Sequence, residues 1–225
     1  MERHHFDDEL EELKKALLRM GALVEERVHQ SIASLVRRHI EGAERVIAGD
    51  KEINDLQIEI DDRCLKLLAL QGPMASDLRL ITAAMKINAD LERIGDQAVN
   101  IAENAIKLIP LPLLKPLIDI PRMADMAEAM MRDALDAFVR HDVPLAREVL
   151  ARDDDVDSLK DQLFRELLTY MMADPATIER ALALILISRN LERIADHATN
   201  IGEDVIFVEE GKDVRHHHEE VGARH

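Results

Sequence analysis

The chain repeats itself, and this internal duplication is the feature that most constrains its fold. Shifting the sequence by 103 residues aligns identical residues of the two halves, for example Asp50 with Asp153. Shifting it by 100 residues aligns LERIGDQAVNIAE, residues 91–103, with LERIADHATNIGE, residues 191–203. Because a repeated unit folds in the same way each time, we expect two copies of one structural unit related by a pseudo-twofold axis.

Each copy has the apolar pattern of three helices. Apolar residues recur at intervals of three and four, the spacing that places them on one face of an α-helix. The pattern predicts an all-α fold of two tandem, pseudo-twofold-related three-helix bundles that form a six-helix array. The predicted helices cover residues 7–47, 50–70 and 76–109 in the first copy and, with a turn at 141–144, residues 122–140, 154–172 and 175–208 in the second.

A proline-rich segment separates the two copies. Residues 110–121, PLPLLKPLIDIP, contain four prolines. Proline lacks a backbone N–H and clashes with the preceding helical turn, so no helix continues through this segment. We therefore predict a first three-helix repeat at 1–109, a linker at 110–121 and a second repeat at 122–208. A tail at 209–225 has no apolar periodicity and is expected to be mobile.

Composition excludes several classes of protein. The chain has 29 Lys+Arg against 45 Asp+Glu, a net charge of −16, which argues against a nucleic-acid partner. With no Trp, one Tyr and four Phe, it has few rings to stack bases or line a small-molecule pocket. Its single cysteine, Cys64, fits a reducing compartment. The longest apolar run, residues 181–187, is far below the ~20 residues that cross a bilayer. We expect a cytoplasmic protein without a transmembrane segment.

The duplicated segment places four oxygen-bearing side chains on one helical face. At about 100° per residue, two glutamates, an aspartate and an asparagine fall within about 80° of one another, opposite the apolar stripe. Most acidic pairs at this spacing are solvated surface, but repetition of the whole set favours a site for hard cations such as Mg²⁺, Mn²⁺, Ca²⁺ or iron. The predicted ligands are Glu92, Asp96, Asn100 and Glu103 in the first copy and Glu192, Asp196, Asn200 and Glu203 in the second.

Two neighbouring positions carry other chemistry. Arg93 and Arg193 lie about 100° from the carboxylate face. The sequence favours a salt bridge from each to a neighbouring helix over contact with an anion. His197 follows Asp196, but the matched residue in the first copy is Gln97, so no symmetric ligand role is expected for this position.

The two segments LERIGDQAVNIAE and LERIADHATNIGE, within a duplicated three-helix unit, resemble the PhoU family of bacterial phosphate-signalling proteins. The resemblance extends from about residue 7 to 208, and Ala195 in place of Gly95 is its main departure. It implies a homodimeric all-α protein with multinuclear metal sites at E/DxxxD motifs, holding iron or zinc. Its implied ligands here are Glu92 with Asp96 and Glu192 with Asp196, and the asparagines and remaining glutamates of the two faces are additional ligands.

The resemblance also implies a function. PhoU proteins are non-enzymatic negative regulators of phosphate uptake and of the phosphate-starvation response. They link the phosphate-specific ABC transporter to a membrane sensor histidine kinase. The chain is accordingly expected to be a cytoplasmic regulator that docks peripherally at the inner face of the membrane.

Two other functions compete with this one. A carboxylate-bridged di-metal oxidoreductase would need inward-facing glutamates and two Glu-x-x-His motifs on facing helices. The chain has one credible match, Glu26 with His29, and it is not repeated. The sequence contains no P-loop, GxSxG or GxGxxG motif. The second alternative is a helical scaffold that binds partners without any metal.

Overall fold

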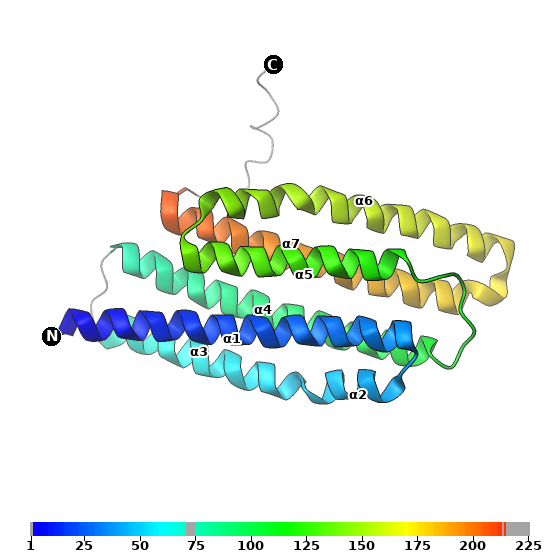
Figure 1. Ribbon diagram of the computed structural model, residues 1–225, viewed down its shortest axis with the longest axis horizontal. Helices are drawn as coiled ribbons and strands as arrows, with labels where there is room; N and C mark the ends of the chain where they lie inside the picture. Colours follow the sequence, from blue (N-terminus) through cyan, green and yellow to red (C-terminus); the bar gives the residue numbers. More distant parts are fainter. Residues whose placement is uncertain (1, 71–74, 213, 215–225) are drawn as a thin grey trace, which may run out of the picture.

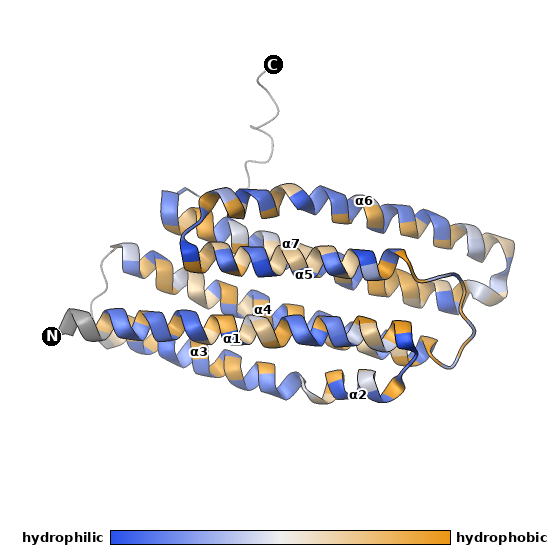
Figure 2. Ribbon diagram, viewed as in Figure 1, coloured by the Kyte–Doolittle hydropathy of each residue, from blue (hydrophilic) through white to orange (hydrophobic). Residues whose placement is uncertain are grey.

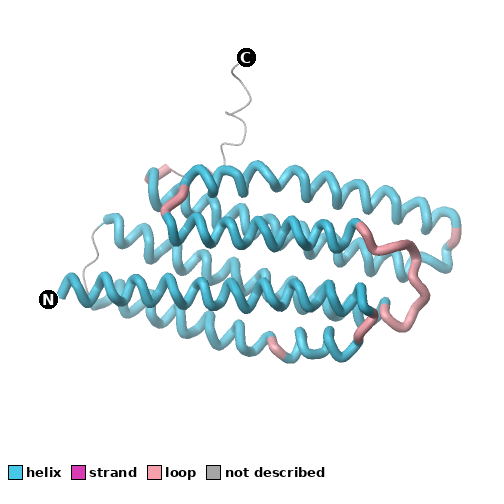
Figure 3. Tube along the Cα trace, in the orientation of Figure 1, coloured by secondary structure: helices cyan, strands magenta, loops and turns pink. Residues whose placement is uncertain are grey.

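The computed structural model describes residues 2–70, 75–212 and 214, and every regular element in that part of the chain is helical (Figures 1 and 3). The predicted all-α class is therefore confirmed. The α-helices are α1 (Glu2–Arg37), α2 (Ile40–Ala48), α3 (Asp50–Leu70), α4 (Ala75–Leu108), α5 (Asp119–Arg140), α6 (Val143–Ala173) and α7 (Ile178–Glu210), with a 3₁₀ turn η1 (Pro175–Thr177) before α7.

The helices run side by side along one long axis in two groups (Figure 1). In the first group α1, α2 and α3 pack on α4, and in the second α5 and α6 pack on α7. The groups meet where α4 packs against α7 and α1 against α5. Polar and apolar residues alternate along each helix (Figure 2), and the buried apolar side chains of both groups form one continuous core. Of the described helices, none is long and apolar enough to cross a membrane.

One unusual backbone conformation occurs at matched positions of the two copies. Arg38 follows α1 and His141 follows α5, and their φ angles are 55° and 59°. Residues other than glycine seldom adopt this left-handed conformation. Since Arg38 and His141 are related by the shift of 103 residues, the two copies share the same chain reversal.

Two predicted helix boundaries were wrong. The single helix expected over 7–47 is interrupted at Arg38 and forms α1 and α2. The helix expected over 154–172 begins earlier, so that α6 is continuous where the first copy has α2 and α3. The matched residues explain the difference: Gly49 ends α2, whereas Arg152 stands at the same place in α6. Glycine in a helix interior costs about 1 kcal/mol relative to a good helix former.

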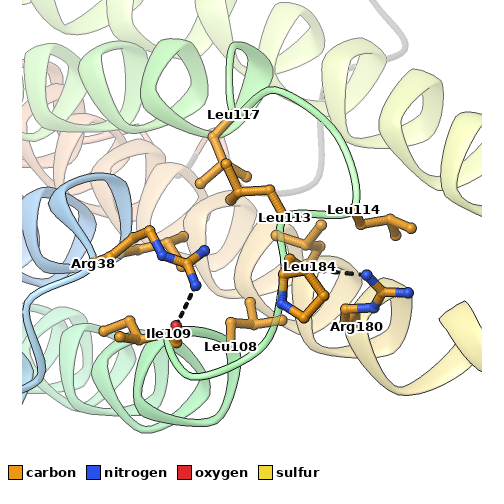
Figure 4. Close-up of a pocket in the computed structure, with 10 residues that line it drawn as sticks. Arg38, Leu108, Ile109, Leu113, Leu114, Leu117, Arg180 and Leu184 are labelled. Atoms are coloured by element: carbon orange, nitrogen blue, oxygen red, sulfur yellow. Dashed lines mark hydrogen bonds between the residues drawn. The ribbon is translucent and has the colours of Figure 1, made fainter.

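The linker is held against one end of the molecule by two arginines (Figure 4). Arg38 donates hydrogen bonds to the carbonyl oxygens of Ile109 and Leu111, the latter at 2.7 Å. Arg180 of α7 donates to the carbonyl oxygen of Pro112 at 3.1 Å. The apolar cavity beneath has a volume of about 20 Å³, room for little more than a water molecule. The segment is thus packed connecting structure, and no ligand pocket lies under it.

The linker is also shorter than predicted, because α5 begins at Asp119. Pro121 therefore lies in the first turn of α5. A proline is tolerated there, since the N–H groups of a first helical turn have no intrahelical acceptor. At the other end of the chain α7 extends to Glu210, and most of the predicted mobile tail lies outside the described residues.

Two ion pairs cross between α1 and α5, and each is the pseudo-symmetry mate of the other. Arg132 of α5 bonds Glu25 of α1, and His29 of α1 lies 3.7 Å, Nδ1 to Oε2, from Glu128 of α5. The shift of 103 residues converts Glu25 into Glu128 and His29 into Arg132. The Glu128 side chain is only 11% exposed, and its burial raises the pKa of this carboxyl above the usual range.

We predict that Glu128→Gln raises the melting temperature at pH 8 and raises it less at pH 4. Because folding raises the pKa of Glu128, the stability that its protonated form contributes is present below the ordinary value of 4.5 and lost as pH rises through the folded pKa. Removing the charge at pH 8 should gain about 1 kcal/mol, a shift of a few degrees. The control is Glu25→Gln, whose carboxylate pairs with an arginine; an equal gain from this variant would show that burial of Glu128 is not the cause.

Candidate functional site

The eight predicted ligands lie on α4 and α7, the two helices that pack together at the centre. The apolar stripes of both segments are buried, so the polar residues turn away from the core as predicted, with one exception. Of the predicted ligands, Glu92, Asn100 and Glu192 are half-buried, Asp96, Glu103, Asp196 and Asn200 are exposed, and Glu203 is buried.

Glu203 contradicts the expectation of an outward strip, and its surroundings give the reason. A Cβ placed on the preceding Gly202 would lie 2.7 Å from Leu150 Cδ1 and 3.3 Å from the carbonyl oxygen of Ala146. The uninterrupted α6 therefore approaches α7 closely beside Glu203, which is only 9% exposed. In the first copy, where α2 and α3 are separate helices, the matched Glu103 stays exposed.

In the first copy, the neighbouring helix α3 supplies a further carboxylate beside the predicted ligands Glu92 and Asp96. Asp50 begins α3, and its charge acts on both Glu92 and Asp96 of α4. Partial burial, together with the charges of Asp96 and Asp50, raises the pKa of Glu92. Partial burial and Asp50 likewise raise the pKa of Asp96. We call Asp50, Glu92 and Asp96 the first acidic cluster.

The second copy contains a larger cluster of the same kind. Partial burial, and then the charges of Asp196 and Asp157, raise the pKa of Asp153 to about 6. Partial burial, followed by Glu192 and Asp157, raises the pKa of Asp196. We call Asp153, Asp157, Glu192 and Asp196 the second acidic cluster. Its members come from α6 and α7, as those of the first come from α3 and α4.

A lysine distinguishes the second cluster from the first. Lys160 Nζ lies 2.9 Å from Asp157 Oδ1, 3.1 Å from Glu192 Oε1 and 3.8 Å from Asp161 Oδ1. Although burial opposes the shift, the hydrogen bonds to Asp157 and Glu192 raise the pKa of Lys160. The matched residue in the first copy is Gln57, which carries no charge. Lys160 therefore offsets part of the negative charge of the second cluster, whereas the matched position in the first cluster offers no such charge.

The donor chemistry of the clusters suits a metal, although their present geometry does not enclose one. Carboxylate oxygens are the ligands that hard cations prefer, and partial burial together with neighbouring carboxylates raises the pKa values of Glu92 and Asp153. Within the described ranges, however, no three Asp, Glu, His or Cys side chains are grouped closely enough to hold a metal ion. A cation would draw the carboxylates together and, in the second cluster, compete with Lys160 for Glu192.

The sequence interpretation missed Asp50 and Asp153 as members of these clusters. The signal was present, because the shift of 103 residues aligns the two aspartates. The long run of identical residues between the copies lies in α4 and α7, whereas the two aspartates lie on other helices. Spacing within one helix does not reveal a ligand that a neighbouring helix supplies. Asp157 had a weaker signal: its match is Asn54, which donates a 2.8 Å hydrogen bond to Asp50.

The expected bridges from Arg93 and Arg193 to neighbouring helices are not formed. Both guanidinium groups are exposed, and neither has a hydrogen bond or ion pair to any residue that the structure describes. His197 bonds a carboxylate that belongs to neither acidic cluster: its Nδ1 lies 2.8 Å from Oδ1 of Asp90 in α4.

Repulsion in the second cluster leads to a prediction about the metal-free protein. In a chelating buffer at pH 7, Asp153→Asn should raise stability by about 1 kcal/mol, allowing for the solvent screening of a half-exposed carboxyl. Folding raises the pKa of Asp153 from 3.8 to about 6, so wild-type stability should fall as pH rises from about 4 through 6. Thermal melts across this range should be flatter for the variant. Asp155→Asn, at an exposed position of α6, is the control; a similar effect there would contradict the assignment to Asp153.

Comparison with known proteins gives the same family across both copies. Residues 17–105 and 120–205 each match the PhoU domain model. The phosphate-specific transport system accessory protein PhoU homolog of Aquifex aeolicus is 44% identical over 210 residues, which cover 93% of this chain and 95% of that protein. PhoU homolog 2 of Thermotoga maritima is 36% identical over 215 residues, covering 96% of this chain and 92% of its own.

Solved structures agree with the sequence relatives. The crystal structure of PhoU from Pseudomonas aeruginosa has a TM-score of 0.89 and 41% identity, covering 92% of this chain and 100% of that chain. The phosphate transport system regulatory protein PhoU from Streptococcus pneumoniae has a TM-score of 0.87 and 33% identity, covering 93% of this chain and 99% of that chain. The match of both repeats to the PhoU domain, together with sequence and structural similarity along nearly the whole chain, shows that this protein belongs to the PhoU family.

Proposed function

We propose that this protein is a non-enzymatic regulator of phosphate uptake and a negative regulator of phosphate-starvation signalling. The observation that carries the proposal is the match of both repeats to the PhoU domain, in a chain that spans nearly the full length of its relatives. Those relatives are named as accessory proteins of the phosphate-specific transport system, and a solved relative as its regulatory protein. A signalling role fits a molecule whose acidic groups lie on its surface and not in an enclosed pocket.

The proposed partners are the phosphate ABC transporter and a membrane sensor histidine kinase. The protein would act in the cytoplasm as a homodimer and dock on these partners at the inner face of the membrane. Family resemblance supports this assignment. The helical array offers long exposed faces for such contacts (Figure 1).

We infer that metal cations, iron or zinc, bind at the two acidic clusters. The support is the duplicated carboxylate set, the carboxylates that each cluster gains from a neighbouring helix, and the pKa values raised by partial burial and, to a lesser degree, by neighbouring carboxylates. A bound cation would supply charge compensation and join α3 to α4 and α6 to α7. Asn100 and Asn200 and the exposed Glu103 could complete the coordination, whereas Glu203 is covered.

A metal-free scaffold is the second candidate, and Lys160 is the observation that favours it. Its ammonium already compensates part of the second cluster. The di-metal oxidoreductase is disfavoured by the structure, because the clusters lie on the outer faces of α4 and α7, and His29 of the one Glu-x-x-His match faces Glu128.

Metal content separates these candidates. We predict that the protein isolated from cells contains metal and that combined alanine substitution of Glu92, Asp96, Glu192 and Asp196 removes it, as measured by elemental analysis. The control is Asp55→Ala with Glu59→Ala, an exposed acidic pair of the same spacing on α3. Unchanged metal content in the fourfold variant would exclude the clusters as the site and favour the scaffold.

The regulatory role is tested in cells that lack their own PhoU. A reporter of the phosphate-starvation response should stay active in phosphate-rich medium, and expression of this protein should repress it. An unchanged reporter, with the protein shown to be folded and expressed, would count against the proposed function. Repression by the fourfold alanine variant would show that regulation does not need the acidic clusters.

A further inference from the structure

A shallow hollow of about 490 Å³ lies between α4 and α7. Arg93 and Gln97 of α4 and Arg193, Asp196, His197 and Asn200 of α7 line it. Asp196 belongs to the second acidic cluster and Asn200 is one of its proposed additional ligands, but the two arginines and His197 give this surface groups that the acidic clusters lack.

The hollow is built around the pseudo-twofold axis. The two helices are antiparallel, since Lys86 bonds Asp204 at 2.9 Å while Asp90, farther along α4, bonds His197, earlier in α7. The shift of 100 residues converts Arg93 into Arg193 and Gln97 into His197. Both members of each pair line the same hollow, so the duplication brings one arginine from each repeat to a single place.

The two arginines are available to a ligand. Although the chain has a net charge of −16, neither guanidinium forms a hydrogen bond or close ion pair with a carboxylate among the described residues, and only the longer-range charge of Arg93 acts on Glu92. A guanidinium presents several N–H donors in a planar fork that matches the oxygens of phosphate or carboxylate. The residues that line the hollow carry two guanidinium groups and one carboxylate, Asp196, a formal charge of 2 − 1 = +1; a second carboxylate, Asp90, is bonded to His197 and Asn200 behind this lining.

The floor of the hollow contains further polar groups, one of them without a partner. Gln97 is 8% exposed, and its side-chain oxygen is buried and accepts no hydrogen bond within the described structure. Such an acceptor favours a nearby hydrogen-bond donor, and an N–H group, a water molecule or the O–H of a singly protonated phosphate can each supply one. On the other side His197 is held in place by Asp90, which also accepts a hydrogen bond from Asn200 at 3.4 Å.

We propose that this hollow is a binding site for a phosphate group, held between Arg93 and Arg193. The preference for phosphate over a carboxylate rests on the proposed function; the preference for an anion rests on the unpaired arginines. The phosphate is free inorganic phosphate or the phosphate of a nucleotide, which share the same oxygens. Asp196 opposes binding, and a cation in the second acidic cluster would offset its charge.

Titration calorimetry on the full chain in a chelating buffer of low ionic strength tests the site. Inorganic phosphate and AMP are titrated separately; binding of either supports the site, and the tighter ligand identifies the source. We expect Arg93→Gln and Arg193→Gln each to weaken binding at least about tenfold, the loss of one charge-assisted contact. Asp196→Asn should strengthen binding, and Arg165→Gln, at an exposed arginine of α6, should leave it unchanged.

No heat from either ligand with wild-type protein, or wild-type affinity in the double arginine variant, would overturn the proposal. Thermal melts of the variants check that they are folded, and the wild-type titration decides the question even if a variant is not. Because the reporter assay does not depend on this titration, loss of phosphate binding and loss of regulation are distinguished.

Discussion

The packing of α4 against α7 is the contact on which the rest of the structure depends. Each helix presents an apolar stripe to the core and a polar face to the surface, and each carries the outer helices of its own repeat. The contact joins two half-cores into one. It also sets the order of charges across the surface: an acidic cluster on each side, with the arginines of both repeats between them.

The two repeats keep the same chain reversal but differ in surface charge and in helix continuity, since α6 is one helix where the first repeat has α2 and α3. Two features occur in both repeats. Arg38 and His141 have the same left-handed backbone conformation, and the contacts between α1 and α5 are related by the pseudo-symmetry. At the surface the copies differ: Lys160 compensates the second cluster where the first has Gln57, and His197 takes the place of Gln97. The two acidic clusters therefore differ in charge although they arose from one repeated unit. If both bind a cation as proposed, we expect their affinities to differ.

The sequence predicted what depends on helical periodicity and missed what depends on contacts between helices. The span of α3 and the ends of α4 were predicted to within a residue, because apolar spacing and proline define them. The break between α1 and α2 at Arg38 was not predicted, because apolar residues continue on both sides of it and no glycine or proline marks it. Burial of Glu203 and the effect of Asp50 on Asp96 of α4 both depend on how helices pack together, which the spacing of residues within one helix does not encode.

We propose that carboxylates from two helices in each repeat bind a cation. Anomalous X-ray scattering from crystals of the protein as isolated, measured at the absorption edge of the metal it contains, would locate that cation. We expect two groups of anomalous peaks related by the pseudo-twofold axis. One group should lie among Asp50, Glu92 and Asp96, and the other among Asp153, Asp157, Glu192 and Asp196. Peaks only elsewhere on the protein, or no peak at either cluster, would rule out these metal sites.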